Sequence, residues 1–199
     1  MNQSLNDLQN AGTIPPTVAD TLVSHLRNGQ HLLITGLPGS GKTTLLRALA
    51  TAVIQPHHQL IQLEPLSEFG RYRVRGQQDN APPDYGIADD VQPSTVLAWL
   101  NLSETRHCTM IAAMTSRGPA TLIDDVAELV RARIGYAPRV KVTRQVAAAT
   151  DVVVHMVRDP NGRTKVAWVV GEFTRQGTFK TLWAQKSHRN VVLAPQQTG

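Results

Sequence analysis

The 199-residue sequence has a single cysteine and no long apolar run, and each shortage excludes a class of protein. With Cys108 alone, neither a disulfide framework nor a zinc site built on several cysteines can form within one chain. No apolar segment approaches the ~20 residues that a membrane-spanning helix needs. The polar N-terminus lacks the basic and then apolar regions of a signal peptide. We therefore expect a cytoplasmic protein, or one held at the inner face of the cytoplasmic membrane through partners.

Charge is unevenly distributed along the chain, although its formal net value is only +5. Residues 1–100 carry 6 Lys/Arg and 8 Asp/Glu, whereas residues 101–199 carry 14 and 7. The basic half could face nucleic acid, a membrane surface or an acidic partner, and a solvated basic face is the simpler interpretation. Aromatic residues make up 5% of the chain, so platforms for stacking bases are scarce and nucleic acid is a disfavoured partner.

Hydrophobic periodicity favours one globular domain with alternating strands and helices. Apolar residues at helical spacing predict helices over residues 17–27, 43–54, 94–102 and 122–134. Short apolar runs predict buried strands over residues 31–35, 60–63 and 110–114. Two β-branched runs, 152–157 and 165–170, flank the turn Asp159–Gly162 and predict a hairpin. Residues 70–86 are rich in turn formers, and we expect them to be irregular.

A glycine-rich loop joins the strand expected at 31–35 to the helix expected from Thr43. The loop fits the Walker A pattern GxxxxGK[ST], in which glycines let successive backbone N–H groups converge on phosphate oxygens at a helix N-terminus. Lys42 would place a positive charge on the β- and γ-phosphates, and the Thr43 hydroxyl would bind Mg²⁺. The motif therefore predicts ATP and Mg²⁺ as cofactors, bound by Gly36, Pro38, Gly39, Ser40, Gly41, Lys42, Thr43 and Thr44.

Such a site also needs an acidic group near Mg²⁺, at the end of a neighbouring strand. Glu64 is one candidate, because it directly follows the strand expected at 60–63. Asp89 and Asp90 are the other candidates, but the segment before them, Tyr85–Ala88, contains a glycine and reads as a poor strand. This acidic pair is equally well interpreted as a solvated turn that caps the next helix.

The order of these segments resembles the CpaF-like ATPases of the type II/type IV secretion superfamily, which drive assembly of Tad/Flp pili. Residues 4–50 are similar to the lead-in and Walker A of that family, and the resemblance continues to about residue 175. Gln62–Glu68 resembles the family's Asp box, with Glu64 and Glu68 at matching positions. Residues 83–91 align with its Walker B segment, where Asp90 falls on the glutamate and Gln92 on the arginine.

The resemblance implies a three-layer α/β fold, a P-loop NTPase of the RecA-like kind with a mainly parallel sheet and a C-terminal β-hairpin. It divides the chain into a helical lead-in (1–29), an ATPase domain (30–183) and a polar tail (184–199). The family's separate N-terminal domain has no counterpart ahead of residue 4. The family carries arginines after the Asp box, and the candidates for them in this sequence are Arg71, Arg73 and Arg75.

The resemblance also implies roles for the site residues. Glu64 would polarise the attacking water, Asp90 would be the carboxylate beside Mg²⁺, and Lys42 with Thr43 would clamp the phosphates. His107 matches the family's first histidine, but Thr115 replaces the His-box histidine and Gln92 the Walker B arginine. Nucleotide binding is therefore better supported than fast hydrolysis.

Two functions of different classes remain open. The first is an ATPase that forms a hexameric ring and drives a pilus or secretion machine at inner-membrane platform proteins. The second is a degenerate module that binds ATP and regulates such a ring with little hydrolysis. The conjugative-transfer branch is a variant of the first, since the closing hairpin resembles it equally well. Four arginines could reach a neighbouring subunit's nucleotide or an acidic platform protein, or simply form a solvated helix face: Arg131, Arg133, Arg139 and Arg144.

Overall fold

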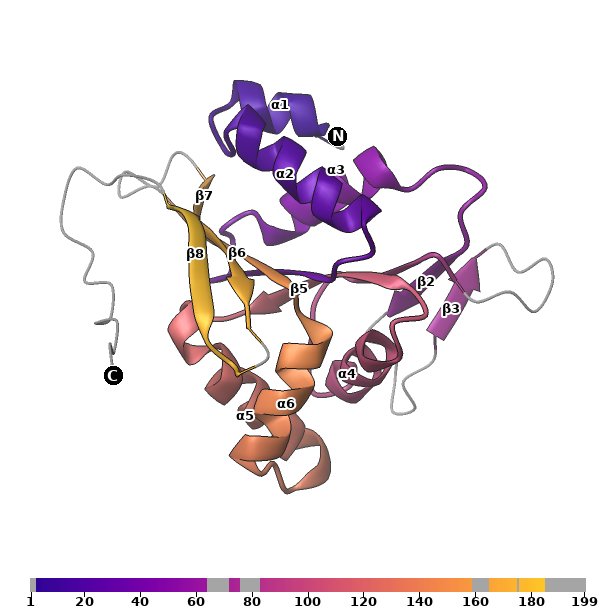
Figure 1. Ribbon diagram of the computed structural model, residues 1–199, viewed down its shortest axis with the longest axis vertical. Coiled ribbons are helices and arrows are strands. Elements are labelled where there is room, and N and C mark those ends of the chain that lie inside the picture. Colours follow the sequence, from indigo (N-terminus) through magenta and orange to yellow (C-terminus); the bar gives the residue numbers. More distant parts are fainter. Residues whose placement is uncertain (1–2, 64–71, 76–82, 159–164, 175, 185–199) are drawn as a thin grey trace.

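The computed structural model describes residues 3–63, 72–75, 83–158, 165–174 and 176–184, in which helices cover both faces of a central sheet (Figure 1). The helices are α1 (Leu5–Asn10), α2 (Pro16–Arg27), α3 (Lys42–Val53), α4 (Val96–Thr105), α5 (Leu122–Ile134) and α6 (Arg139–Ala149), with a short 3₁₀ turn, η1 (Pro119–Thr121), before α5. The strands are β1 (Leu32–Gly36), β2 (Leu60–Leu63), β3 (Tyr72–Arg75), β4 (Tyr85–Ala88), β5 (Thr109–Thr115), β6 (Val152–Arg158), β7 (Lys165–Phe173) and β8 (Phe179–Ala184).

The eight strands in the described residues lie in the order β3-β2-β4-β5-β1-β6-β7-β8. The central strands β2, β4, β5, β1 and β6 pair in parallel, while β3 at one edge and β7 and β8 at the other pair antiparallel. A parallel sheet must be covered on both faces, and the two layers of helices provide that cover. The chain therefore has the expected three-layer α/β fold of the P-loop type, with β1 near the middle of the sheet.

Side chains of the central strands alternate between two hydrophobic cores. Leu32 and Ile34 of β1 pack with α1, α2 and α3, whereas Leu33 packs with α4, α5 and α6. On β5, Ile111 belongs to the first core and Met110 to the second. All five residues of β1 are buried, as a strand covered on both faces requires.

The expectation that residues 70–86 are irregular is wrong at both ends of the segment. Tyr85–Ala88 forms β4, which pairs in parallel with β2 on one side and β5 on the other. Gly86 does not weaken this strand, because a Cβ at that position would lie 2.1 Å from Sδ of Met110. The glycine thus makes room for a buried methionine of the neighbouring strand. Tyr72–Arg75 forms β3, which pairs antiparallel with β2.

The C-terminal part of the sheet is larger than the expected hairpin. β6 and β7 form that hairpin, and β8 extends it antiparallel to β7. Helix α6 is a further element that the periodicity did not indicate, since its buried residues are small or β-branched. Trp99 of α4 is 1% exposed and belongs to the second core, together with Leu100 of the same helix. Across the described residues, no helix has the length and apolar character needed to cross a membrane.

Candidate functional site

The glycine-rich loop crosses the carboxyl end of the parallel sheet, between β1 and α3. Gly39 and Gly41 adopt positive φ angles of 77° and 98°, a region that favours glycine. A Cβ at Gly36 would lie 2.3 Å from the Met156 carbonyl oxygen, and one at Gly39 would lie 2.4 Å from a guanidinium nitrogen of Arg158. Gly36 is therefore required because the backbone of β6 packs directly against it, and Gly39 and Gly41 because of their positive φ angles.

Lys42 is the first residue of α3, and its side chain folds back over the loop. Its Nζ donates hydrogen bonds to the carbonyl oxygens of Gly36 (2.9 Å) and Leu37 (3.1 Å). An ammonium group has three protons, so one donor remains for a further acceptor. Burial lowers the pKa of Lys42, and the negative charge of Asp90 works in the opposite direction.

Asp89 and Asp90 follow β4 directly, but they engage different partners. Asp89 forms an ion pair with Arg47 of α3, at 3.1 Å. Asp90 accepts a hydrogen bond of 2.7 Å from Nε2 of Gln92, and its charge acts on Lys42. Only β5 separates β4 from β1, so both acidic residues emerge at the same edge of the sheet as the loop. Of the two, Asp90 is the carboxylate that acts on the loop lysine.

The loop also carries a buried polar atom that lacks a partner within the described residues. Ser40 is 2% exposed, and its Oγ makes no hydrogen bond there. Thr43 and Thr44 follow Lys42 in the first turn of α3 and are half-buried. A cradle of backbone N–H groups, a cation and hydroxyls at a helix N-terminus fits a phosphate group.

The donor set also fits Mg²⁺ better than a metal that is held in a cage of protein ligands. The described part of the chain contains no group of three or more His, Cys, Asp or Glu able to hold a metal ion. Thr43 and Asp90 would supply one hydroxyl and one carboxylate. Mg²⁺ commonly takes one or two such protein ligands and completes its shell with phosphate oxygens and water.

One residue of β6 contacts the loop and a second contacts β1 just before it, and neither was singled out as a site residue from the sequence. Arg158 ends the strand, and its Nε donates to the Gly39 carbonyl oxygen at 3.0 Å. His155 is 6% exposed and lies 3.0 Å from the Thr35 hydroxyl through its Nδ1. Burial lowers the pKa of His155, and the Lys42 charge lowers it further. Burial and the neighbouring charge thus both favour the neutral form of this imidazole.

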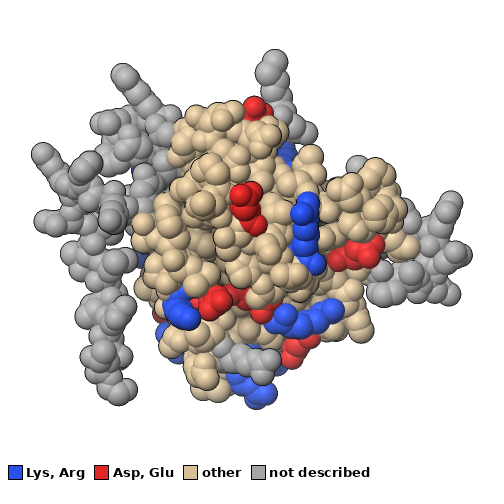
Figure 2. All heavy atoms as spheres, turned by 45° about the horizontal axis from the view of Figure 1, so that its top comes forward, with Lys and Arg blue, Asp and Glu red and all other residues tan. Residues whose placement is uncertain are grey.

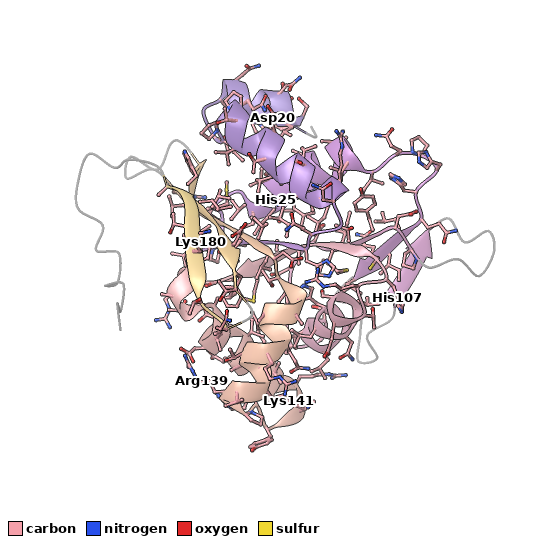
Figure 3. The ribbon with its side chains drawn as sticks, viewed as in Figure 1. Asp20, His25, His107, Arg139, Lys141 and Lys180 are labelled. Atoms are coloured by element: carbon pink, nitrogen blue, oxygen red, sulfur yellow. The ribbon has the colours of Figure 1, made fainter. Side chains whose placement is uncertain are left out.

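The structure places only some of the other residues that were singled out from the sequence. Glu64, Glu68 and Arg71 lie outside the described residues, as do the side chains of Arg73 and Arg75. Thr115 is exposed at the carboxyl end of β5, on the loop's edge of the sheet. His107 precedes β5 and so lies at the opposite, amino edge, beside the end of α4 in Figure 3.

The arginine group from the sequence divides between two helices below the sheet. Arg131 and Arg133 lie in the last turn of α5, while Arg139 and Arg144 belong to α6. Arg139 forms an ion pair with Asp124 of α5. All four side chains are exposed, and none contacts the glycine-rich loop within the described residues.

The chain is similar to one family model, to two curated proteins and to several solved ATPase structures. The family model "Novel STAND NTPase 3" matches residues 15–81, about a third of the chain. Two proteins from strains of Mycobacterium tuberculosis, each named "Putative conjugal transfer protein", are 26% identical over 206 residues, covering 91% of this chain and 58% of theirs. The chain thus spans less than two thirds of the curated relatives it matches.

Solved structures share the fold. The VirB11 ATPase of the Brucella suis type IV secretion system matches with a TM-score of 0.63 at 20% identity, over 84% of this chain and 54% of that one. The Legionella pneumophila ATPase DotB matches with a TM-score of 0.55 at 16% identity, over 88% and 51%. At these identities the likeness concerns the fold, and the chain is thereby similar to P-loop-type ATPases whose structures extend beyond it.

Proposed function

We propose that the chain binds ATP with Mg²⁺ and hydrolyses it as a motor subunit of a type IV secretion or conjugation machine. The observation that carries this proposal is the position of Lys42, whose ammonium lies on the Gly36 and Leu37 carbonyl oxygens at the start of α3. The charge of Asp90 from β4 acts on the same group. A nearby cation and carboxylate at a glycine-rich helix N-terminus are what a phosphate–Mg²⁺ complex requires.

Each residue then has a definite task in the reaction. Backbone N–H groups of the loop and the remaining donor of Lys42 would hold the β- and γ-phosphates, and Thr43 and Asp90 would hold the metal. The bound Mg²⁺ would neutralise charge that develops on the phosphate oxygens. Glu64 is the candidate that polarises the attacking water. Catalysis of this kind consists of positioning and electrostatic stabilisation.

The machine served by the subunit is a second part of the proposal. The names of the relatives point to conjugal transfer and type IV secretion, whereas the N-terminal lead-in resembles the Tad/Flp pilus branch. We place the chain in the conjugation or type IV branch, with pilus assembly as the alternative. In either branch it would work as a hexameric ring docked on inner-membrane platform proteins.

A nucleotide-binding regulatory module is the second candidate, and two observations favour it. Gln92 occupies the place where the resemblance implies an arginine, and its amide is hydrogen-bonded to Asp90 at 2.7 Å. Thr115, at the end of β5, replaces a histidine of the implied pattern. Neither side chain can supply a positive charge to the γ-phosphate, so hydrolysis could be slow while binding stays intact.

The test is ATP turnover and nucleotide affinity of the purified chain, with and without Mg²⁺. Lys42→Ala, Glu64→Gln and Asp90→Asn should each abolish Mg²⁺-dependent turnover, while Asp89→Asn serves as the matched control because Asp89 pairs with Arg47. Binding that requires Lys42 without turnover above the Glu64→Gln background would favour the regulatory module. A wild-type chain that binds no nucleotide would refute both functions.

A further inference from the structure

The end of α5 and the start of α6, residues 131–141, form a tip that exposes apolar side chains. Ile134 is 55% exposed, Tyr136 is 71% exposed and Val140 is 76% exposed. They are three of the five large hydrophobic residues that are exposed in the described chain. In Figure 1 this tip is the end of the α5–α6 pair that points away from the sheet, on the side opposite α1 to α3. Apolar side chains gathered at one exposed place mark a contact surface more often than scattered ones do.

The tip carries positive charge only. Four cations lie between residues 131 and 141 without an acidic residue among them: Arg131, Arg133, Arg139 and Lys141. Arg139 is paired with Asp124 of α5, whereas the other three form no ion pair with any residue that the structure describes. Figure 3 shows Arg139 and Lys141 at this end of the two helices. By contrast, basic and acidic residues are interspersed on the face seen in Figure 2.

A groove continues from the tip along the outer side of α6 towards the end of α4, with a volume of about 800 Å³. Pro138, Val140 and Ala148 give it apolar walls, and Lys141 and Arg144 place two cations along it. Glu104 of α4 is its single acidic lining residue. The groove therefore combines apolar lining residues with two cations and one carboxylate.

We propose that this groove and the tip bind an acidic, amphipathic segment of a partner protein. Its apolar side chains would pack on Val140 and Ala148, and its carboxylates would face Lys141 and Arg144. The lining residues follow α6 from Pro138 to Ala148, and a groove along a helix suits a partner helix or an extended segment with apolar residues at fixed spacing. The net positive charge of the lining selects an acidic partner and raises its rate of association.

The groove is separate from the nucleotide site, so this proposal does not depend on ATP binding. The inner end of α6 lies at the amino edge of the sheet, where Arg106 donates to the Ala148 carbonyl oxygen and pairs with Asp151 just before β6. The glycine-rich loop lies at the carboxyl edge. A partner in the groove would therefore leave the face around Lys42 open.

The experiment uses fluorescently labelled peptides about four helical turns long, with leucine at i, i+3, i+4 and i+7 positions. One peptide carries glutamate on its other face, and two matched peptides carry glutamine or lysine there. The full chain should bind the glutamate peptide at least about tenfold more tightly than the glutamine peptide, and added salt should weaken that preference. Equal affinity for both peptides would overturn the proposal.

A charge-reversed variant keeps the test independent of folding. Lys141 lies in the first turn of α6, where a carboxylate is favourable to the helix, so Lys141→Glu combined with Arg144→Glu should fold normally. This variant should lose its affinity for the glutamate peptide and bind the lysine peptide instead. Lys180→Glu, on β8, is the control and should behave as the wild type. A preference for the glutamate peptide that survives in the charge-reversed variant would also overturn the proposal.

Two further measurements identify other occupants. The first is co-sedimentation with phosphatidylglycerol vesicles. If the wild type binds these vesicles but none of the peptides, and the charge-reversed variant does not bind the vesicles, the tip would be assigned to a membrane surface. A change in oligomeric state between the wild type and the charge-reversed variant, seen by light scattering, would assign it to a second copy of the chain. Either result would replace the proposed acidic segment.

Discussion

The two edges of the parallel sheet both carry histidine, arginine and aspartate, but the polar groups at each edge are hydrogen-bonded to different extents. At the amino edge, His31, Arg106 and Asp151 form a closed network. Asp151 accepts from both guanidinium nitrogens of Arg106, at 2.8 and 3.0 Å, and from the His31 backbone N–H at 2.7 Å. His31 contacts the Ser103 carbonyl oxygen through Nε2 and accepts the Met110 N–H through Nδ1. Every polar atom of the imidazole and the carboxylate is thus used.

The carboxyl edge leaves its polar groups partly unused. Lys42 has one donor beyond its two backbone acceptors, and the buried Ser40 hydroxyl has no partner within the described residues. Unsatisfied buried groups cost free energy, and a ligand at the loop would recover that cost for Ser40. At the amino edge the buried Thr150 hydroxyl also lacks a partner within the described residues, so the difference between the edges rests on the lysine and the glycine-rich loop. We infer from this comparison that the closed network stabilises the fold and that the open groups at the other edge are available to a ligand.

The largest expected effect on stability comes from opening the closed network. Asp151→Ala would leave Arg106 and the His31 N–H without the carboxylate that accepts their hydrogen bonds. We expect the free energy of unfolding to fall by about 2 kcal/mol, a value kept low because the side chains of Arg106 and Asp151 are partly exposed. Asp90→Asn should change it by less than about 0.5 kcal/mol. Urea denaturation of both variants measures the difference. Equal losses would contradict the division between the two edges.

The next effect concerns the buried histidines, one at each edge. Burial lowers the pKa of both His31 and His155 from the ordinary value of 6.5. The unfolded chain therefore takes up protons that the folded chain does not. The contribution of these neutral histidines to the free energy of unfolding has its full value above pH 6.5. It decreases as the pH falls through that value, by up to about 1.4 kcal/mol per pH unit for each histidine.

Denaturation at several pH values between about 7.5 and 5.5 checks this prediction. The pH dependence should be smaller in His31→Gln and in His155→Gln than in the wild type, since each variant removes one titrating group. In this window Asp151 adds little, because its lowered pKa keeps the carboxylate ionised. A slope unchanged in both variants would show that other groups control it.

The smallest effect is a modest loss of nucleotide affinity at the open edge. Arg158→Ala removes the hydrogen bond from Nε to the Gly39 carbonyl oxygen, which holds the loop in shape before a ligand arrives. We expect a loss of about three- to tenfold, the value of one exposed hydrogen bond, with Arg158→Lys intermediate. Calorimetric titration with ADP is the measurement. Unchanged affinity in Arg158→Ala would show that the loop keeps its shape without this contact.

The sequence was sufficient to find the open edge but not the closed one. Apolar runs and the Walker A spacing predict β1, the loop and α3, because these features are local. The network of His31, Arg106 and Asp151 joins three distant segments, and no spacing along the chain reveals it. Arg158 and His155 were missed for the same reason, since they matter only because β6 lies beside β1.

The acidic pair after β4 shows a second limit of the sequence. Gly86 made the preceding segment look like a poor strand, and the reason for that glycine is Met110 on a strand that follows later in the chain. The choice between Asp89 and Asp90 likewise depends on tertiary neighbours. Arg47 engages the first carboxylate, while the second acts on Lys42.

The most direct test of the central claim is the affinity for ATP of the wild type, Lys42→Ala, Asp90→Asn and Asp89→Asn, each with and without Mg²⁺. We predict that Lys42→Ala loses binding under both conditions and that Asp90→Asn loses only the gain due to Mg²⁺. Asp89→Asn should match the wild type. Nucleotide binding that is the same in the wild type and Lys42→Ala would contradict the assignment of the carboxyl edge as a phosphate site.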